Sequence, residues 1–242
     1  MIKAAIQHII DISKPTIEEI DGQAYSDKRL HRIKHNPLAQ SIRMNTLSSL
    51  VEYIKSNTDD MKGKMIIHIE DAQNVVMYSQ LDDDRERETL VEVRAKIPHF
   101  PFNEYMGNEQ FGIALQAKFL PTDERALVLK FAGTVELGTV NEYGDDGVTQ
   151  KATVKTGITS KVDAKVPNPV VLQAYRTFIE VEQPTSKYIF RMKGDKYDST
   201  VKCGLYEADG GAWEIDAMKN IKEYLQKELK DELKEKTHII IS

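Results

Sequence analysis

The sequence is poor in cysteine: among its 242 residues only Cys203 carries a thiol. One thiol cannot form an internal disulfide and cannot supply the several thiolates of a structural zinc site. Disulfides are common in oxidising compartments, so the cysteine count favours a reducing one. Cys203 alternates with Val201 and Leu205 along one face of an apolar segment, which predicts a buried thiol in a strand rather than a reactive nucleophile.

Long apolar runs are also missing. The longest, Ala126–Ala132, has seven residues and includes Lys130, whereas a membrane span needs about 18. The first residues show no apolar stretch followed by a small-residue cleavage site, so we expect no signal peptide. The formal net charge of −5 disfavours general attraction to nucleic acid or to anionic lipid. We therefore expect a cytoplasmic protein with no membrane partner.

The sequence lacks the glycine-rich phosphate motifs, the G-x-S-x-G nucleophile pattern and the usual metal-ligand spacings. Four segments partly resemble such motifs, but each lacks a required feature, such as the P-loop lysine, an acidic residue between paired histidines, or the D-x-D-x-D-G spacing of a calcium loop. These segments are Gly210-Gly211, His31 with His35, Asp82-Asp83-Asp84 and Asp145-Asp146. We expect no metal, no cofactor and no catalytic residue.

Periodicity in the first 140 residues predicts helices around an antiparallel meander. Helical spacing marks residues 3–12, which precede a polar arm to residue 45 with a hint of strand at 16–20, and residues 46–56, for which Asn45 is the expected N-cap. Alternation marks three strands, and helical spacing then returns in two further helices, the second capped by Thr122. The strands are expected at 64–70, 74–80 and 89–95, and the helices at 103–119 and 122–134.

From residue 141 the sequence pattern becomes typical of β-strands. The turn-forming residues 141–147 mark a boundary, which divides the chain into 1–45, 46–140 and 141–242, the last two compatible with one shared core. Apolar residues from Ile215 to Leu233 then predict one long amphipathic helix that closes the strand-rich part, giving an α+β fold. Strands are expected at 148–158, 160–166, 170–182, 187–193 and 200–207.

The last residues, 237–242, form an apolar β-branched tail after a charged helix end. Such a segment is expected either to add to a sheet edge of the same chain or to pair with a neighbouring subunit. The choice between these two stays open at this point.

Charged side chains along the expected strand 170–182 suggest a ligand groove, with a solvent face or a subunit interface as the alternative. Arg176 and Glu180 lie on one face of it together with Glu182, and the turn before the last helix adds acids, glycines and the single tryptophan. The candidate ligand-binding residues are Arg176, Glu180, Arg191, Glu207, Asp209, Gly210, Gly211 and Trp213.

A second candidate site lies in the polar arm, where basic residues alternate with aromatic ones. Such a mixture binds single-stranded nucleic acid through charge and base stacking, while a solvated arm is the alternative in an acidic chain. Nucleic acid is thus a less favoured partner. The candidate residues are Tyr25, Arg29, His31, Arg32 and Lys34.

Three segments are distinctive as whole blocks: residues 143–157 (YGDDGVTQKATVKTG), residues 166–184 with YRTFIEVEQP, and residues 203–213 with EADGGAW. Together with a weaker block at 111–135, they resemble the YfdQ-like family of phage and prophage proteins, a domain of unknown function. The resemblance covers about residues 40–235. It implies a phage origin and the cytoplasm of a bacterial host, and it carries over no catalytic residue.

These expectations combine into a phage-encoded, non-enzymatic, self-assembling binding protein that acts in the host cytoplasm. Two features suggest the homo-oligomer: the expected strand at 170–182, whose charged face could form a subunit interface, and the apolar tail. Three alternatives stay open: an anti-defence protein that sequesters a nucleotide signal or a host immune protein, a single-stranded DNA-binding or recombination accessory protein, and a metal-dependent hydrolase. Basic and aromatic side chains that meet near Gly210-Gly211 would favour the nucleotide alternative.

Overall fold

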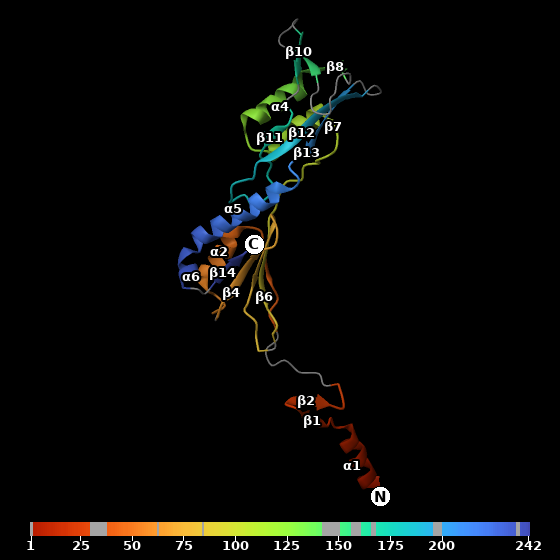
Figure 1. The fold of residues 1–242 in the computed structure, drawn as a ribbon, viewed down its shortest axis with the longest axis vertical. Coiled ribbons are helices and arrows are strands. Elements are labelled where there is room, and N and C mark those ends of the chain that lie inside the picture. The colour runs from red at the N-terminus through yellow and green to blue at the C-terminus, as the bar shows by residue number, and fades with distance from the viewer. Residues whose placement is uncertain are drawn as a thin grey trace. The chain divides into compact units, whose positions relative to one another are not determined.

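The computed structural model describes residues 2–29, 38–61, 63–83, 85–141, 151–155, 161–165, 168–195, 200–235 and 238–242. Helices and several sheets, mostly antiparallel, confirm the α+β class (Figure 1). The chain divides into two compact units, residues 1–38 and 39–242. Of the expected boundary at 141–147, Asn141 ends a strand (Val135–Asn141), and residues 142–147 lie outside the described residues.

The first unit is a helix followed by a hairpin, called the N-terminal arm here (residues 2–29). The expected helix is confirmed as α1 (Ile2–Ser13), and the hint of strand grows into a hairpin of β1 (Ile17–Ile20) and β2 (Gln23–Ser26). Its two-residue turn is Asp21-Gly22, with φ of 54° and 76°. Positive φ at both positions is what a primed hairpin turn requires, and Asp-Gly is a sequence that supplies it.

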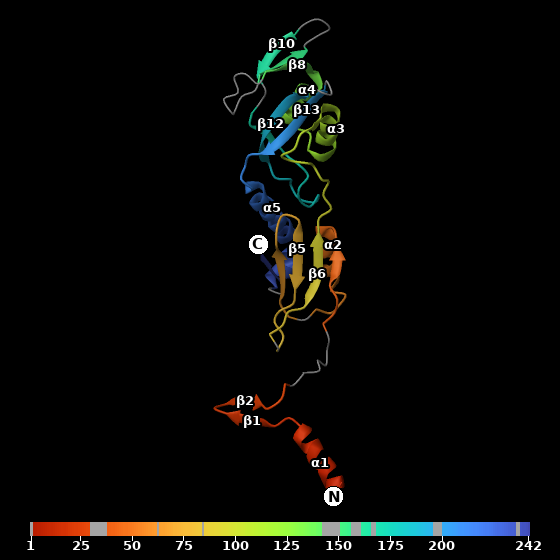
Figure 2. The same cartoon turned by 90° about the vertical axis from the view of Figure 1, so that its right-hand side faces the viewer.

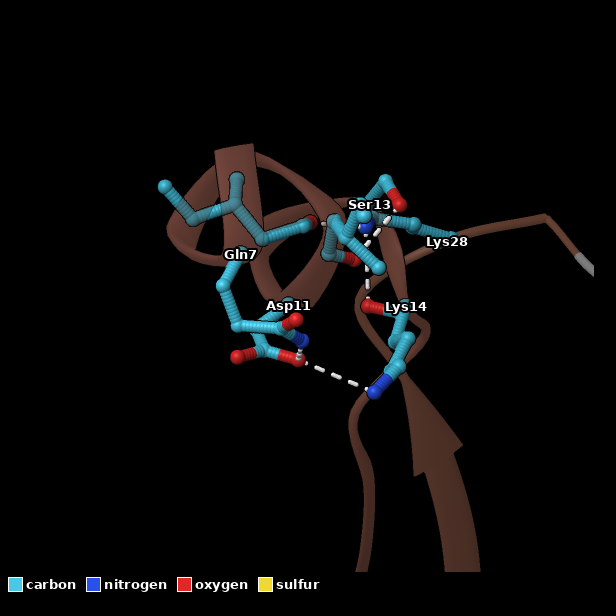
Figure 3. Close-up of polar contacts among 7 residues, drawn as sticks. Gln7, Asp11, Ser13, Lys14 and Lys28 are labelled. Carbon is cyan, nitrogen blue, oxygen red and sulfur yellow. Dashed lines mark hydrogen bonds and ion pairs between the residues drawn. The ribbon is translucent and has the colours of Figure 1, made fainter. Parts of the chain in front are cut away.

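Polar contacts fix the helix of the arm to its hairpin. Lys28 donates through Nζ to the carbonyl oxygens of Ile12 and Lys14, the second at 2.8 Å (Figure 3). A cation at these carbonyls also complements the helix dipole, because the last carbonyls of a helix lack intrahelical partners. Asp27 Oδ1 accepts a hydrogen bond of 2.7 Å from the amide of Thr16. None of the described arm residues is buried.

The second unit begins with the expected meander, which forms the centre of a five-stranded sheet (Figure 2). Strands β4 (Met65–Ile69), β5 (Asn74–Tyr78) and β6 (Thr89–Arg94) are antiparallel. The edge strands β3 (Ile42–Met44) and β14 (His238–Ile241) pair in parallel with β6 and β4. The period-two alternation puts Ile67, Val75 and Val91 on one buried face, as a half-buried sheet requires.

Helix α2 (Leu47–Ser56) covers that face with the expected stripe of Leu47, Leu50, Val51 and Ile54. Its N-cap is Thr46, not Asn45 as expected. Thr46 has extended backbone and its Oγ1 accepts from the Ser49 amide at 3.3 Å, which satisfies one of the free amides of the first turn. The helix therefore starts one residue later than expected.

The last long helix, α5 (Ala212–Glu228), packs on the five-stranded sheet instead of closing the strand-rich part. Its buried residues Ile221 and Leu225 join Leu229 in the same core as α2, and α6 (Lys230–Lys234) follows it (Figure 1). Ile215, expected in the buried stripe, is 73% exposed. The first turn of α5 belongs to the connection between the two cores, so the buried stripe begins only in the second turn.

A second core lies between two helices and the strands of the C-terminal part. Helices α3 (Asn108–Lys118) and α4 (Asp123–Thr134) cover a sheet with the order β11-β12-β13-β7. These strands are β11 (Val170–Leu172), β12 (Ser186–Asp195), β13 (Thr200–Glu207) and β7 (Met106–Gly107). A further three-stranded sheet contains β8 (Val135–Asn141), β9 (Lys151–Lys155) and β10 (Lys161–Lys165). Phe111, Leu115, Phe119 and Phe190 fill the core.

Two details of this region differ from expectation, and one agrees with it. Helix α3 starts at residue 108 rather than 103, because Asn103 has φ of 64° and donates its amide to Leu205 of β13 at 2.8 Å. In α4, Leu127 precedes the buried Val128 in the apolar run of the helix, yet it is 40% exposed. The Thr122 cap is confirmed by the bond of 3.1 Å from the Arg125 amide to Thr122 Oγ1.

The prediction of one long strand at 170–182 is wrong. Strand β11 ends at Leu172, and residues 173–185 run as a loop from one core to the other and back. Phe178 and Val181 of this loop are buried in the core of the five-stranded sheet, whereas Leu172 and Tyr188 on either side belong to the second core. The two cores therefore do not divide the chain at residue 141.

The apolar tail completes a sheet of its own chain. Strand β14 pairs with β4 with Ile239 opposite Ile66 and Ile240 opposite Ile67. This outcome matches the first of the two alternatives for the tail. The tail thus no longer supports assembly between subunits.

The alternation along β14 yields a matched pair of substitutions. Ile240 packs against the core of the five-stranded sheet, while its neighbour Ile239 is 45% exposed on the other face. We expect Ile240→Ala to lower the free energy of unfolding by about 2 kcal/mol and Ile239→Ala by about 0.5 kcal/mol or less. Urea unfolding of both variants measures this difference. Equal losses would contradict the register of β14.

Candidate ligand site around Arg176

The two cores are joined at three places in the described chain, and each place supplies a side chain to one cluster. Residues 96–102 lead from β6 into the second core and contribute Phe102. The loop 173–185 contributes Arg176. The passage from β13 to α5 contributes Glu207 and Trp213. The cluster is therefore built where the connections between the cores come together.

The guanidinium of Arg176 lies among aromatic rings. Its central carbon is 4.1 Å from the centre of the Phe102 ring, 4.5 Å from that of Trp213 and 5.3 Å from that of Tyr188. These distances suit cation–π attraction, and the arginine is only 5% exposed. Burial raises the pKa of the Tyr188 hydroxyl to about 12, against an opposing effect of the Arg176 charge, so Tyr188 faces the cluster as a neutral phenol.

Glu207 supplies the countercharge. Its Oε1 accepts a hydrogen bond of 2.6 Å from Arg176 Nη2, a short charge-assisted contact. The two partners are unequally buried, because the side chain of Glu207 is 36% exposed while that of Arg176 is 6% exposed. Asn103 holds the other end of Glu207, accepting from its amide through Oδ1 at 3.1 Å.

Arg176 has hydrogen-bonding capacity that the described residues leave unused. Its Nη1 is buried and has no hydrogen-bond partner among them. A buried donor on a charged group without a partner costs stability. An oxygen of a ligand that reaches Nη1 past the exposed Glu207 would remove that cost.

Gln183 holds the loop of Arg176 in place. Its Oε1 accepts from the amides of Arg176 at 2.9 Å and Thr177 at 3.2 Å, and its Nε2 donates to the carbonyl of Phe178 at 2.9 Å. Thr177 in turn donates through Oγ1 to the carbonyl of Ala72, in the first turn of the meander. Gln183 thus satisfies backbone groups of residues 176–178 that a strand would have paired. The start of the loop is held differently, because Gln173 and Tyr175 form backbone hydrogen bonds with Leu120 and Lys118.

A hollow of about 350 Å³ lies beside this cluster, and we call it the Arg176 hollow. Its volume falls in the range of small-molecule sites. Its wall combines two cations with one carboxylate and several flat or apolar groups. The residues that line it are Gln73, Ile97, Pro98, His99, Phe100, Phe102, Lys118, Ala174, Tyr175, Arg176, Glu207 and Trp213.

Three of the eight predicted ligand residues, Arg176, Glu207 and Trp213, meet at the hollow. Glu180 lies elsewhere: its Oε1 accepts from the Ser48 amide at 3.2 Å, in the first turn of α2, where a carboxylate complements the helix dipole. Arg191 lies in β12 opposite Gly204. The expected groove of Arg176, Glu180 and Arg191 is wrong because residue 176 is not in a strand.

The turn before α5 has a backbone role. Gly210 and Gly211 have φ of 64° and 84°, a conformation that glycine adopts without strain, and Gly211 is the N-cap of α5. Asp209 is not the N-cap; its Oδ1 accepts from the Gly211 amide at 3.2 Å. The three residues bring Trp213 to the hollow without lining it.

The predicted nucleic-acid residues are only partly described. Tyr25 and Arg29 lie in the N-terminal arm, where the Tyr25 side chain is 52% exposed and its hydroxyl is 3.2 Å from Gln23 Oε1. His31, Arg32 and Lys34 lie outside the described residues. The binding of nucleic acid by this arm stays a prediction.

Sequence reasoning missed several contributors to the site. Phe102 and Lys118 are distant from Arg176 in sequence, whereas Gln183 and Tyr188 follow it closely but carry no local pattern that predicts their contacts with it. One signal was available, the Phe-Pro-Phe run at residues 100–102, because aromatic residues beside a proline outside any helix or strand often pack at a junction. Lys118 donates through Nζ to the carbonyl of His99, which holds it at the rim.

The other groups that could carry chemistry are the Cys203 thiol and possible metal ligands. Burial raises the pKa of the Cys203 thiol from 9.0 to about 12 and the residue is fully buried, so it is a poor nucleophile, as expected. Across the parts of the chain that the structure describes, no three side chains of histidine, cysteine, aspartate or glutamate gather in a way that suits a metal ion.

Comparison of the chain with protein-family models, with curated proteins and with solved structures finds no match. Among the helices of the described residues, none has both the length and the apolar character that crossing a bilayer takes.

The scaffold of the site can be tested at Gln183, which is 4% exposed. We expect Gln183→Ala to lower the free energy of unfolding by about 3 kcal/mol, because buried amides and carbonyls lose their partners. The exposed Gln226 of α5 offers a control, Gln226→Ala, for which we expect less than about 0.5 kcal/mol. Denaturant unfolding measures both, and a Gln183→Ala variant as stable as the control would refute this role.

Cys203 offers a test of the second core, because it is the single thiol. We expect iodoacetamide at mildly alkaline pH to leave the folded protein unmodified and to alkylate the unfolded one. The raised pKa also means that the neutral thiol stabilises the fold below pH 9.0, and that this contribution is lost as the pH rises toward 12. Rapid alkylation of the native protein, followed by mass spectrometry, would contradict the burial of this strand.

Proposed function

We propose that this protein is a non-enzymatic binding protein that takes a small anionic ligand with a flat ring, of the nucleotide class, into the Arg176 hollow. The observation that carries the proposal is the meeting of Arg176 with Phe102, Tyr188 and Trp213 beside a hollow of about 350 Å³. Sequestration of a nucleotide signal, one of the alternatives raised by the sequence, calls for this combination of basic and aromatic side chains near Gly210-Gly211.

The anionic half of the ligand follows from the charges of the wall. Lys118 and Arg176 contribute two cations against the single carboxylate of Glu207. Arg176 Nη1 lacks a partner among the described residues and Glu207 is the exposed member of its ion pair. A phosphate oxygen could replace Glu207 at the guanidinium, whose planar fork suits phosphate as well as carboxylate.

The flat half of the ligand follows from the rings. Trp213 and Tyr175 line the hollow together with Pro98. Aromatic side chains stack on any nucleobase, since every base presents a π face. The hollow therefore combines a place for a phosphate with a place for a base, which is what a nucleotide requires of a binding protein.

The biological setting is part of the proposal and rests on the sequence resemblance alone. A phage protein that binds without turnover in the bacterial cytoplasm would act on the ligand by lowering its free concentration. The poor nucleophilicity of the buried Cys203, which is not among the residues that line the hollow, lends support to binding rather than catalysis.

Intrinsic fluorescence tests the proposal directly, because Trp213 is the single tryptophan and lines the hollow. We expect mononucleotides or cyclic dinucleotides to quench or shift its emission in a saturable way. Lys118→Ala should weaken binding by roughly tenfold through loss of a charged contact. Glu207→Gln should strengthen it, because the competing negative charge is removed.

The matched control is Lys187→Ala, at an exposed lysine of β12 that does not line the hollow. We expect its affinity to equal that of the unaltered protein. Fluorescence that responds to no nucleotide at millimolar concentration, or an equal loss of affinity for Lys118→Ala and Lys187→Ala, would overturn the proposal.

A further inference from the structure

The sheet β11-β12-β13-β7 has two faces, and only one of them belongs to the second core. Along β12 and β13, alternate residues such as Phe190 and Cys203 are buried in that core. The side chains between them point to the opposite face, called the outer face here, and are exposed or half-buried. The cross-strand pairs of the outer face are Ile189 with Tyr206, Arg191 with Gly204, and Lys193 with Lys202.

The segment that leads into β7 lies against the outer face at Gly204. A β-carbon at residue 204 would stand 2.7 Å from the carbonyl oxygen of Glu104, so a larger residue would push this segment away. The contact brings Tyr105 beside Tyr206, with ring centres 5.6 Å apart and ring planes at 69°. Nζ of Lys193 lies 4.2 Å from the centre of the Tyr105 ring, a distance that suits cation–π attraction. Two half-buried rings and a cation thus meet on the outer face.

This part of an acidic chain is basic. Strands β12 and β13 contain four basic residues against two acidic ones, whereas the whole chain has a net charge of −5. Glu104 adds one acid, and the connection 196–199 adds one lysine and one aspartate, so the balance stays positive. A basic patch on an acidic chain favours an anionic partner at that patch. The basic residues are Lys187, Arg191, Lys193 and Lys202, and the acidic ones are Asp195 and Glu207.

The pairing of Lys193 with Lys202 strengthens the case for an anion. Like charges directly opposite each other destabilise a sheet, and a phosphate between them would relieve their repulsion. Arg191 lies two residues from Lys193 on the same face, and its guanidinium can donate two hydrogen bonds to one phosphate. The outer face therefore offers cations to more than one phosphate of a chain.

We propose that the outer face binds single-stranded nucleic acid, with phosphates at Arg191, Lys193 and Lys202 and bases stacked on Tyr105 and Tyr206. Unpaired bases can lie on aromatic side chains of a sheet, whereas the bases of a duplex are already stacked inside it. The combination of rings with cations favours nucleic acid over other polyanions. None of these five residues lines the Arg176 hollow, so the inference does not depend on the ligand proposed there.

Fluorescence anisotropy of a labelled single-stranded oligonucleotide, titrated with the full chain at several salt concentrations, tests the charges. The variant Lys193→Ala/Lys202→Ala is compared with Lys219→Ala/Lys227→Ala, which removes two exposed lysines of α5 and alters the net charge equally. We expect the outer-face variant to lose affinity by roughly tenfold or more. Its dependence of log affinity on log salt should flatten by about 1.4, because two phosphate contacts are lost. The α5 variant should bind as the unaltered chain does.

The rings are tested at Tyr206. We expect Tyr206→Ala to weaken binding by roughly tenfold through loss of a stacked base. Tyr206→Phe keeps the ring and should keep the affinity. Circular dichroism shows whether each variant is folded, and the lysine variants test the outer face even where Tyr206→Ala is not.

Three outcomes would overturn the proposal. The first is an unaltered chain that binds no oligonucleotide at low salt. The second is an outer-face lysine variant that binds as tightly as the α5 variant. The third is flotation of the chain with phosphatidylglycerol vesicles, lost in the outer-face variant, without binding of the oligonucleotide, which would assign the outer face to anionic lipid.

Discussion

The guanidinium of Arg176 holds together the connections between the two cores of the larger unit. It contacts Phe102 from the first connection and Glu207 and Trp213 from the last, and it lies in the loop that forms the middle one. A charge this deeply buried is tolerated because one carboxylate and the faces of the rings replace water around it. The arrangement of the two cores and the hollow beside them both depend on that one side chain.

The same interaction explains why a ligand at this place would matter to the whole unit. The Arg176 hollow is lined by residues of the meander turn, of the α3 end and of the α5 start, namely Gln73, Lys118 and Trp213. A ligand that bridges them adds contacts to both cores at once. Binding is then linked to the stability of the junction, because a ligand that favours the folded state stabilises it.

Sequence patterns predicted those elements in which the spacing of the apolar residues matches the set of side chains that are buried. The meander, the stripe of α2 and the Thr122 cap followed from alternation, helical spacing and side-chain capping. The strand expected at 170–182 failed because its alternation of charges reflected three separate surroundings: Arg176 in the cluster, Glu180 at α2 and Glu182 near α5. The buried Gln183 satisfies the loop backbone, and no local pattern signals that role. Arg176, Glu207 and Trp213 were chosen on chemistry, while their aromatic neighbours depend on the tertiary fold.

The apolar tail and the charged strand expected at 170–182 suggested self-association. However, the tail forms β14 in a sheet of its own chain, and Arg176 of the expected strand is buried. Self-association therefore stays a prediction. The central claim, a nucleotide-class ligand beside Arg176, is tested most directly by nitrogen-edited NMR of the full chain, in which Trp213 gives the single indole N–H signal. The account predicts that added nucleotide moves this signal together with the Arg176 side-chain signal until saturation. Signals that stay in place up to millimolar nucleotide would contradict it.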